Sequence, residues 1–94
     1  MHAVIRSYSG AGAAELFDLL EQREEEVREV LTGVPGFVSY AAFRTDSGGT
    51  AVTICQDKTG TEESTRRATA WTKENLTTTV EPPSITEGST VLHF

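Results

Sequence analysis

The spacing of apolar and polar positions predicts four strands. Residues 37–56 divide at a turn over 46–49 into two segments typical of β-strands, and the glycine pair in that turn reaches positive φ at little steric cost. This stretch therefore predicts a hairpin. Residues 2–8, rich in Val, Ile and Tyr, predict a first strand, and residues 89–94 predict a last one.

A helical stripe predicts a long first helix over residues 13–31. Its apolar positions recur at spacings of three, four and seven, as on one face of a helix. Gly33 is expected to end this helix in the left-handed conformation, and Pro35 prevents its continuation. The stripe consists of Leu16, Leu20, Val27, Val30 and Leu31.

A second helix is expected over residues 62–76. Thr59 or Thr61 is expected to cap its start. Because the segment has few apolar residues, the indole of Trp71 should supply most of its anchoring area.

The resulting order, βαββαβ, predicts a ferredoxin-like α+β fold. In this arrangement a four-stranded antiparallel sheet carries two helices on one face. The 94 residues fit one domain over 1–94. The fold serves many unrelated activities, so it does not by itself give a function.

Apolar residues on both faces of the predicted sheet indicate a homodimer. A sheet covered on one face should alternate cleanly between apolar and polar residues, and these strands do not. Two helices cover only one face, so a second copy of the sheet is the simplest cover for the other. The expected pairs of faces are Phe37, Ala41 and Phe43 against Val38, Tyr40 and Ala42 in the second strand, and Val52 and Ile54 against Ala51 and Cys55 in the third.

Charge and composition exclude several classes of partner. The chain has 8 basic and 14 acidic residues and a net charge of −6, with no basic stripe, which disfavours nucleic acid and anionic membranes. Its single cysteine, Cys55, allows no intramolecular disulfide and is expected to be a buried thiol rather than a nucleophile. There is no signal-peptide pattern and no apolar run near the roughly 20 residues of a membrane span, so a cytoplasmic protein is expected.

Several segments together resemble the dimeric α+β barrel superfamily. They are LFDLL at 16–20, VPGFVSY at 34–40, the glycine hairpin and the Trp71 helix. The chain looks similar to small bacterial proteins near the antibiotic-biosynthesis monooxygenases. The resemblance implies a homodimer whose two sheets pack face to face with the helices outside, and a pocket between each sheet and its own helices.

The resemblance also implies possible chemistry. The characterised monooxygenases are cofactor-free enzymes that oxidise aromatic polyketides, and haem-degrading relatives share their fold. Both commonly pair an asparagine on the first strand with a tryptophan on the second helix. Trp71 matches the tryptophan, but the first strand offers Arg6 and Ser7, and the only asparagine is Asn75. No histidine lies near the end of the second helix, which disfavours haem chemistry, and no cofactor is expected.

Four residues are candidates to line a ligand pocket: Trp71, Tyr40, Tyr8 and Arg44. An aromatic wall beside a cation suits a planar, weakly acidic ligand. Tyr40 and Trp71 are equally explained as core aromatics. No catalytic residue is assigned.

No metal site is predicted. His2 and His93 are expected to be surface residues at strand ends, since no third ligand is identifiable.

Three classes of function remain open from the sequence. The favoured one is a homodimeric, non-catalytic protein that binds a small aromatic or other organic ligand. The second is a cofactor-independent monooxygenase or isomerase acting on an aromatic substrate. The third is a protein-interaction module that uses its dimer surface or the acidic helix face at Glu24, Glu25 and Glu29.

Overall fold

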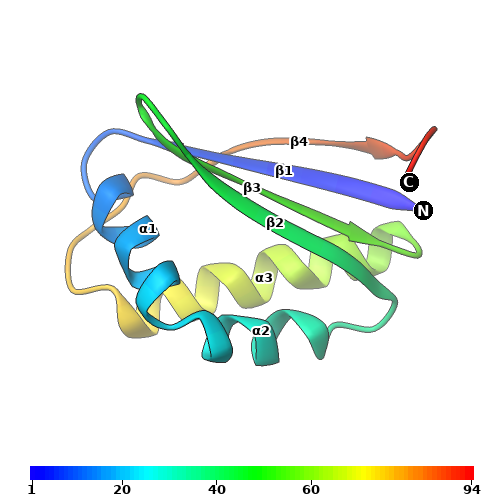
Figure 1. Cartoon of the computed structure of the whole chain (residues 1–94), viewed down its shortest axis with the longest axis horizontal. Coiled ribbons are helices and arrows are strands. Elements are labelled where there is room, and N and C mark those ends of the chain that lie inside the picture. The colour runs from blue at the N-terminus through cyan, green and yellow to red at the C-terminus, as the bar shows by residue number, and fades with distance from the viewer.

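In a computed structural model that describes residues 1–94, a four-stranded antiparallel sheet is covered on one face by helices, and its other face carries none (Figure 1). The strand order is β2-β3-β1-β4, which confirms the predicted ferredoxin-like α+β fold. None of the helices combines the length and apolar character needed to span a bilayer. The elements are β1 (His2–Ser9), α1 (Ala13–Gln22), α2 (Glu24–Thr32), β2 (Phe37–Thr45), β3 (Gly48–Cys55), α3 (Lys58–Asn75) and β4 (Ser84–Ser89).

The predicted first helix is two helices, because the chain leaves helical geometry at Arg23. This residue has φ −117° and ψ 38°, and its guanidinium donates to Asn75 Oδ1 at 2.7 Å. The break turns the chain so that α1 packs against β3 while α2 runs beside α3 (Figure 1). The structure therefore has three helices where two were predicted, although the apolar stripe continues across the break.

The start of α3 also differs from the prediction. The helix begins at Lys58, and Asp57 caps it by accepting a hydrogen bond from the Gly60 N–H at 3.2 Å. Neither Thr59 nor Thr61 is the cap. The sequence did not indicate Asp57 as the cap, because Gly60, a poor helix former, follows it closely.

Glycines act at different places from those predicted. Gly33 has an ordinary φ of −76°, and Gly36, with φ 76°, makes the left-handed turn into β2. The hairpin turns at Asp46 and Ser47, so the glycine pair lies inside β3. A Cβ at Gly49 would overlap the ring of Phe17, so the absence of a side chain lets α1 approach the sheet.

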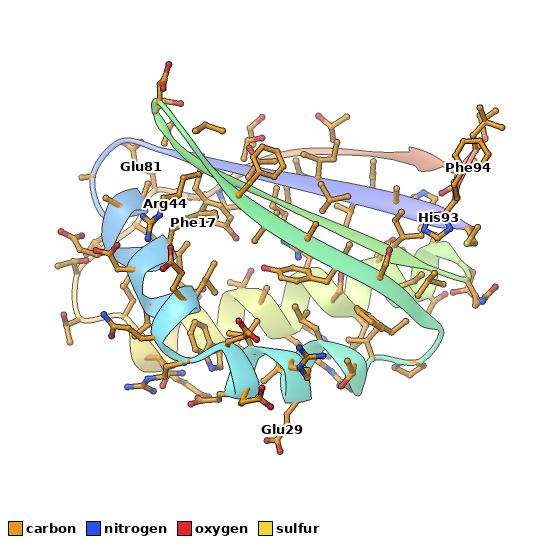
Figure 2. All side chains as sticks on the ribbon, in the orientation of Figure 1. Phe17, Glu29, Arg44, Glu81, His93 and Phe94 are labelled. Atoms are coloured by element: carbon orange, nitrogen blue, oxygen red, sulfur yellow. The ribbon has the colours of Figure 1, made fainter.

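The last strand lies earlier than predicted, because residues 84–89 rather than 89–94 take the place beside β1. Residues 84–89 pair with β1 from Ser7 back to His2, and the Thr90 N–H donates to the Met1 carbonyl at 2.8 Å. The apolar residues expected in this strand, Val91, Leu92 and Phe94, are exposed, and Figure 2 shows Phe94 beyond the end of the sheet.

The sheet has one buried and one open face. In β3, Ala51 and Cys55 are buried under the helices, while Val52 and Ile54 point to the open face, as predicted. In β2 a bulge between Phe37 and Ser39 places Phe37 opposite Cys55, so Phe37 does not share a face with Ala41 and Phe43 as expected. The register places Ile5, Ala41, Phe43, Val52 and Ile54 together on the open face.

Candidate ligand-binding site

The core between sheet and helices contains a small cavity of about 30 Å³, and ten of its twelve lining residues are apolar. Three of the four candidates from the sequence, Tyr8, Tyr40 and Trp71, meet here although they come from β1, β2 and α3. Such a volume accommodates one or two water molecules or one small polar group. The lining residues are Arg6, Tyr8, Leu16, Leu20, Val27, Val30, Leu31, Tyr40, Ala51, Ala68, Trp71 and Thr72.

Trp71 holds the helical side of the cavity. Its side chain is buried, and its indole N–H donates to Glu26 Oε1 on α2 at 2.8 Å. The ring therefore belongs both to the core and to the cavity wall. On the opposite wall Tyr8 packs edge-on against Phe17, with ring centroids 6.0 Å apart.

Both tyrosines of the cavity are held in the neutral phenol form. Burial raises the pKa of Tyr8 above its ordinary value, and the positive charge of Arg6 opposes this effect only in part. Burial likewise raises the pKa of Tyr40, again with partial opposition from Arg6. Each phenol thus remains a hydrogen-bond donor at neutral pH.

Arg6 is the residue of this site that the sequence did not assign. Its side chain is only 1% exposed, and its guanidinium donates to Thr53 Oγ1 at 2.8 Å, Thr65 Oγ1 at 2.9 Å and Ser64 Oγ at 3.4 Å. Its Nε is buried without a hydrogen-bond partner.

A sequence signal for Arg6 did exist. Val4, Arg6 and Tyr8 alternate along β1, and all three are buried on the helix-covered face. A cation at a position that strand periodicity assigns to the core is the pattern that identifies it.

Arg44, the fourth candidate, lies outside the cavity. It is exposed on β2 and forms ion pairs with Asp18 at 2.9 Å and Glu21 at 2.8 Å, which join the hairpin to α1 (Figure 2). The guanidinium of Arg44 is thus already paired with two carboxylates of α1.

Next to the cavity an open groove of about 790 Å³ runs between α1, α2 and the edge strand β2. Arg44 stands on its rim, and Phe17, Phe37 and Phe43 contribute to its apolar surface. Groove and cavity share four wall residues, Leu20, Val27, Leu31 and Tyr40. Side chains alone therefore separate the groove from Arg6.

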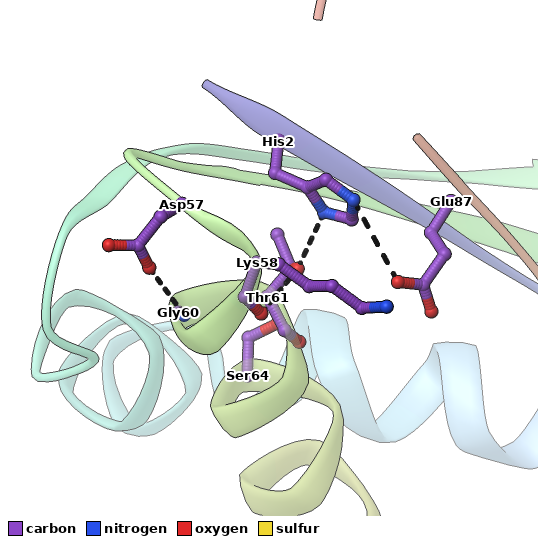
Figure 3. Close-up of polar contacts among 7 residues, drawn as sticks. All are labelled: His2, Asp57, Lys58, Gly60, Thr61, Ser64 and Glu87. Carbon is purple, nitrogen blue, oxygen red and sulfur yellow. Dashed lines mark hydrogen bonds and ion pairs between the residues drawn. The ribbon is translucent and has the colours of Figure 1, made fainter. Parts of the chain in front are cut away.

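His2 is a structural residue rather than the expected surface histidine. Its side chain is 13% exposed, and its Nδ1 lies 2.9 Å from Thr61 Oγ1 (Figure 3). Its Nε2 lies 3.9 Å from Glu87 on β4, so the ring joins β1, α3 and β4. His93 lies beyond the last strand (Figure 2).

Cys55 is fully buried, as predicted, and burial raises the pKa of its thiol, which disfavours the reactive thiolate. Nowhere in the structure do three or more His, Cys, Asp or Glu side chains come together as a metal-binding group.

The fold closely matches that of solved structures. A mutant of MhuD, with two manganese protoporphyrin IX molecules bound per active site, superposes with a TM-score of 0.65 at 18% identity, covering 99% of this chain and 96% of that one. The chain shares the ferredoxin-like α+β fold of that structure. The resemblance drawn from its motifs is thereby confirmed at the level of fold.

Two further solved structures have a similar fold. An ethyl tert-butyl ether D (EthD) family protein from Bacillus halodurans has a TM-score of 0.61 at 12% identity, with 97% of this chain and 99% of that one covered. A mutant of SnoaB, a cofactor-independent oxygenase from Streptomyces nogalater, has a TM-score of 0.53 at 17% identity, with coverages of 99% and 93%. No family model matches the sequence, and no curated protein matches it.

Proposed function

We propose that this protein binds a small organic ligand whose body lies in the groove between β2 and the helices and whose end enters the cavity. The observation that carries the proposal is the shared wall. Leu20, Val27, Leu31 and Tyr40 line both spaces, so a shift of these side chains joins them. The groove's volume, about 790 Å³, is within the range of known ligand sites, roughly 300–1,000 Å³.

The shape of the site supports a flat, largely apolar ligand. The cavity alone is too small for an aromatic ring, so a ligand enters only if a wall residue moves. Tyr40 is the residue best placed to do so, because it is half-buried on an edge strand that pairs on one side only. Side-chain rearrangement at binding sites is common even where the backbone stays fixed.

Binding is tested with 2-naphthalenemethanol, a neutral aromatic probe, followed by the fluorescence of Trp71, the only tryptophan. Ala68 lines the cavity, and we expect Ala68→Val to weaken binding several-fold by filling it. Ala70→Val makes the same change on the exposed face of α3 and should leave affinity unchanged. Absence of saturable binding, or equal effects of the two variants, contradicts the proposed site.

The proposal includes a homodimer formed through the open face of the sheet. Phe43 is 52% exposed and Ile5 37% exposed on that face. Val52 lies between Ile5 and Ala41 in the register, so the apolar residues are contiguous across three strands. A second copy placed on this face removes them from water, which is the main source of association free energy.

A second candidate function is cofactor-independent oxygenation of an aromatic substrate. One support is the cavity itself, which both Trp71 and a polar group, Arg6, line. The other is the fold shared with SnoaB, a cofactor-independent oxygenase. Dioxygen uptake with a hydroxylated anthrone distinguishes the two candidates. Uptake that is lost in Trp71→Phe supports the oxygenase, and ligand binding without uptake supports the non-catalytic protein.

The acidic face of α2 gives less support to an interaction module. Glu24 and Glu25 lie 3.7 and 3.9 Å from the guanidinium of Arg28, within their own helix, and Glu29 points into solvent (Figure 2). These are the features of a solvated helix face.

A further inference from the structure

Arg6 carries a positive charge in the core without a negative partner. Its hydrogen-bond acceptors, on Thr53, Ser64 and Thr65, are neutral hydroxyl groups, and it takes part in none of the ion pairs of the protein. A buried charge is costly unless it is paired and hydrogen-bonded.

The hydroxyl groups fix the position of this charge without neutralising it. They come from β3 and α3 and hold the guanidinium from two sides. Its Nε remains free of any partner inside the core, and the residue lines the cavity. A side chain that only joined the sheet to the helix would need no charge here, because an apolar residue of similar length would pack as well.

The surroundings of Arg6 fit one kind of ligand group. Tyr8 and Tyr40 line the same cavity, and as neutral phenols they can each donate a hydrogen bond. Arg6, Tyr8 and Tyr40 line a space of about 30 Å³ and each carries a hydrogen-bond donor, which matches the acceptor-only character of an oxyanion. Apart from Thr72, the rest of the cavity lining is apolar.

We propose that Arg6 is the anion-binding residue of this site, and that the ligand is a flat apolar molecule carrying one oxyanion, a carboxylate or an acidic enol or phenol, seated between Arg6, Tyr8 and Tyr40. The inference rests on the proposed ligand site and deepens it. The cation beside the aromatic wall is thus Arg6 from inside the core, and Arg44 remains in its ion pairs on the rim.

The first test compares 2-naphthoate with neutral 2-naphthalenemethanol on the wild-type protein, by Trp71 fluorescence and by calorimetry. Since a hydrogen-bonded charge contributes about 1.5–3 kcal/mol, we expect 2-naphthoate to bind roughly 10- to 100-fold more tightly. Equal affinities for the two probes overturn the assignment of an anionic ligand but still support the ligand site. If neither probe binds, both the ligand site and the anion-binding role of Arg6 are overturned. 2-Naphthol, titrated as a third probe, distinguishes a phenolate from a carboxylate.

The second test removes the charge. In Arg6→Met, 2-naphthoate should lose roughly 10- to 100-fold in affinity, while 2-naphthalenemethanol keeps its own. Arg6→Lys keeps the charge but not the planar fork, so it should bind 2-naphthoate at an intermediate level. Arg66→Met is the matched control, because this exposed arginine on α3 lines neither the groove nor the cavity, and it should bind both probes as the wild type does. Equal losses for both probes in Arg6→Met identify a structural residue and overturn the proposal, and the wild-type comparison decides the matter if that variant does not fold.

Discussion

Trp71 belongs both to the core and to the proposed ligand site. Its ring is part of the core cluster around Tyr8, Leu16 and Phe17, and it also forms a wall of the cavity. Its N–H bond to Glu26 fixes the ring, so little freedom remains for it to move aside when a ligand enters. The movement required for binding therefore falls on the opposite wall, at Tyr40.

Replacing Trp71 with alanine should destabilise the protein by about 3–5 kcal/mol, because it removes a buried indole and leaves a cavity. Urea unfolding followed by circular dichroism measures the change. Trp71→Phe should cost less, since it keeps most of the apolar surface and loses only the bond to Glu26. A Trp71→Ala variant with wild-type stability that had lost only ligand binding would falsify the core role of the ring.

The two tyrosines give a prediction about pH. Tyr8 and Tyr40 are the only tyrosines, and burial raises the pKa of each above 10.0 in the folded protein. Their contribution is thus fully present below pH 10 and is lost as pH rises through the folded-state pKa, since the unfolded chain ionises first. Tyrosinate absorbance should rise near pH 10 in urea but only at higher pH in buffer. Identical titration curves in the two solvents would contradict the burial of the phenols.

At the level of elements, local patterns predicted type and order better than boundaries. At the break, Arg23 makes a tertiary contact with Asn75, 52 positions away, which no local pattern contains. The position of β4 is set by its pairing with β1, and the bulge between Phe37 and Ser39 moves Phe37 to the other face of β2. Each of these errors arose where pairing or packing overrides local preference.

Gly49 shows how closely α1 lies against the hairpin. A Cβ there would meet the ring of Phe17, so Gly49→Ala should destabilise by about 1–3 kcal/mol through overpacking. Gly88→Ala is the matched control, because a Cβ at Gly88 on β4 meets nothing within 4 Å. Thermal unfolding of both variants measures the difference. A loss as large for Gly88→Ala would show that chain flexibility, rather than contact with Phe17, sets the cost.

At the level of the whole molecule, the sequence predicted the fold and the three aromatic residues that line the cavity, but not the buried Arg6 beside them. The sequence identified these aromatic residues because large aromatic side chains on the sheet and on the helix are usually buried in the core between them. They are Tyr8, Tyr40 and Trp71. Arg44 was named as the candidate cation, whereas the hydroxyl groups that hold Arg6 in the core lie about 50 to 60 positions away in sequence, beyond any local pattern.

The open face of the sheet gives the last prediction. Val52 lies at its centre on β3, flanked by Ile5 and Ala41, so Val52→Lys places a charge in the middle of the proposed dimer interface. A two-fold axis would bring in the same charge from each copy, and a buried unpaired charge costs several kcal/mol. Sedimentation at micromolar concentration should show a wild-type dimer and a Val52→Lys monomer. Each lysine can reach water in the monomer, so the variant should stay folded.

The matched control is Thr69→Lys, which adds the same charge to the exposed face of α3 and should leave the dimer intact. If both variants dissociate, net charge rather than the sheet face governs assembly. A wild-type protein that sediments as a compact monomer contradicts the interface altogether. The apolar row from Ala41 through Val52 to Ile5 would then lie in water, at a cost that scales with its exposed area at roughly 25 cal/mol per Å².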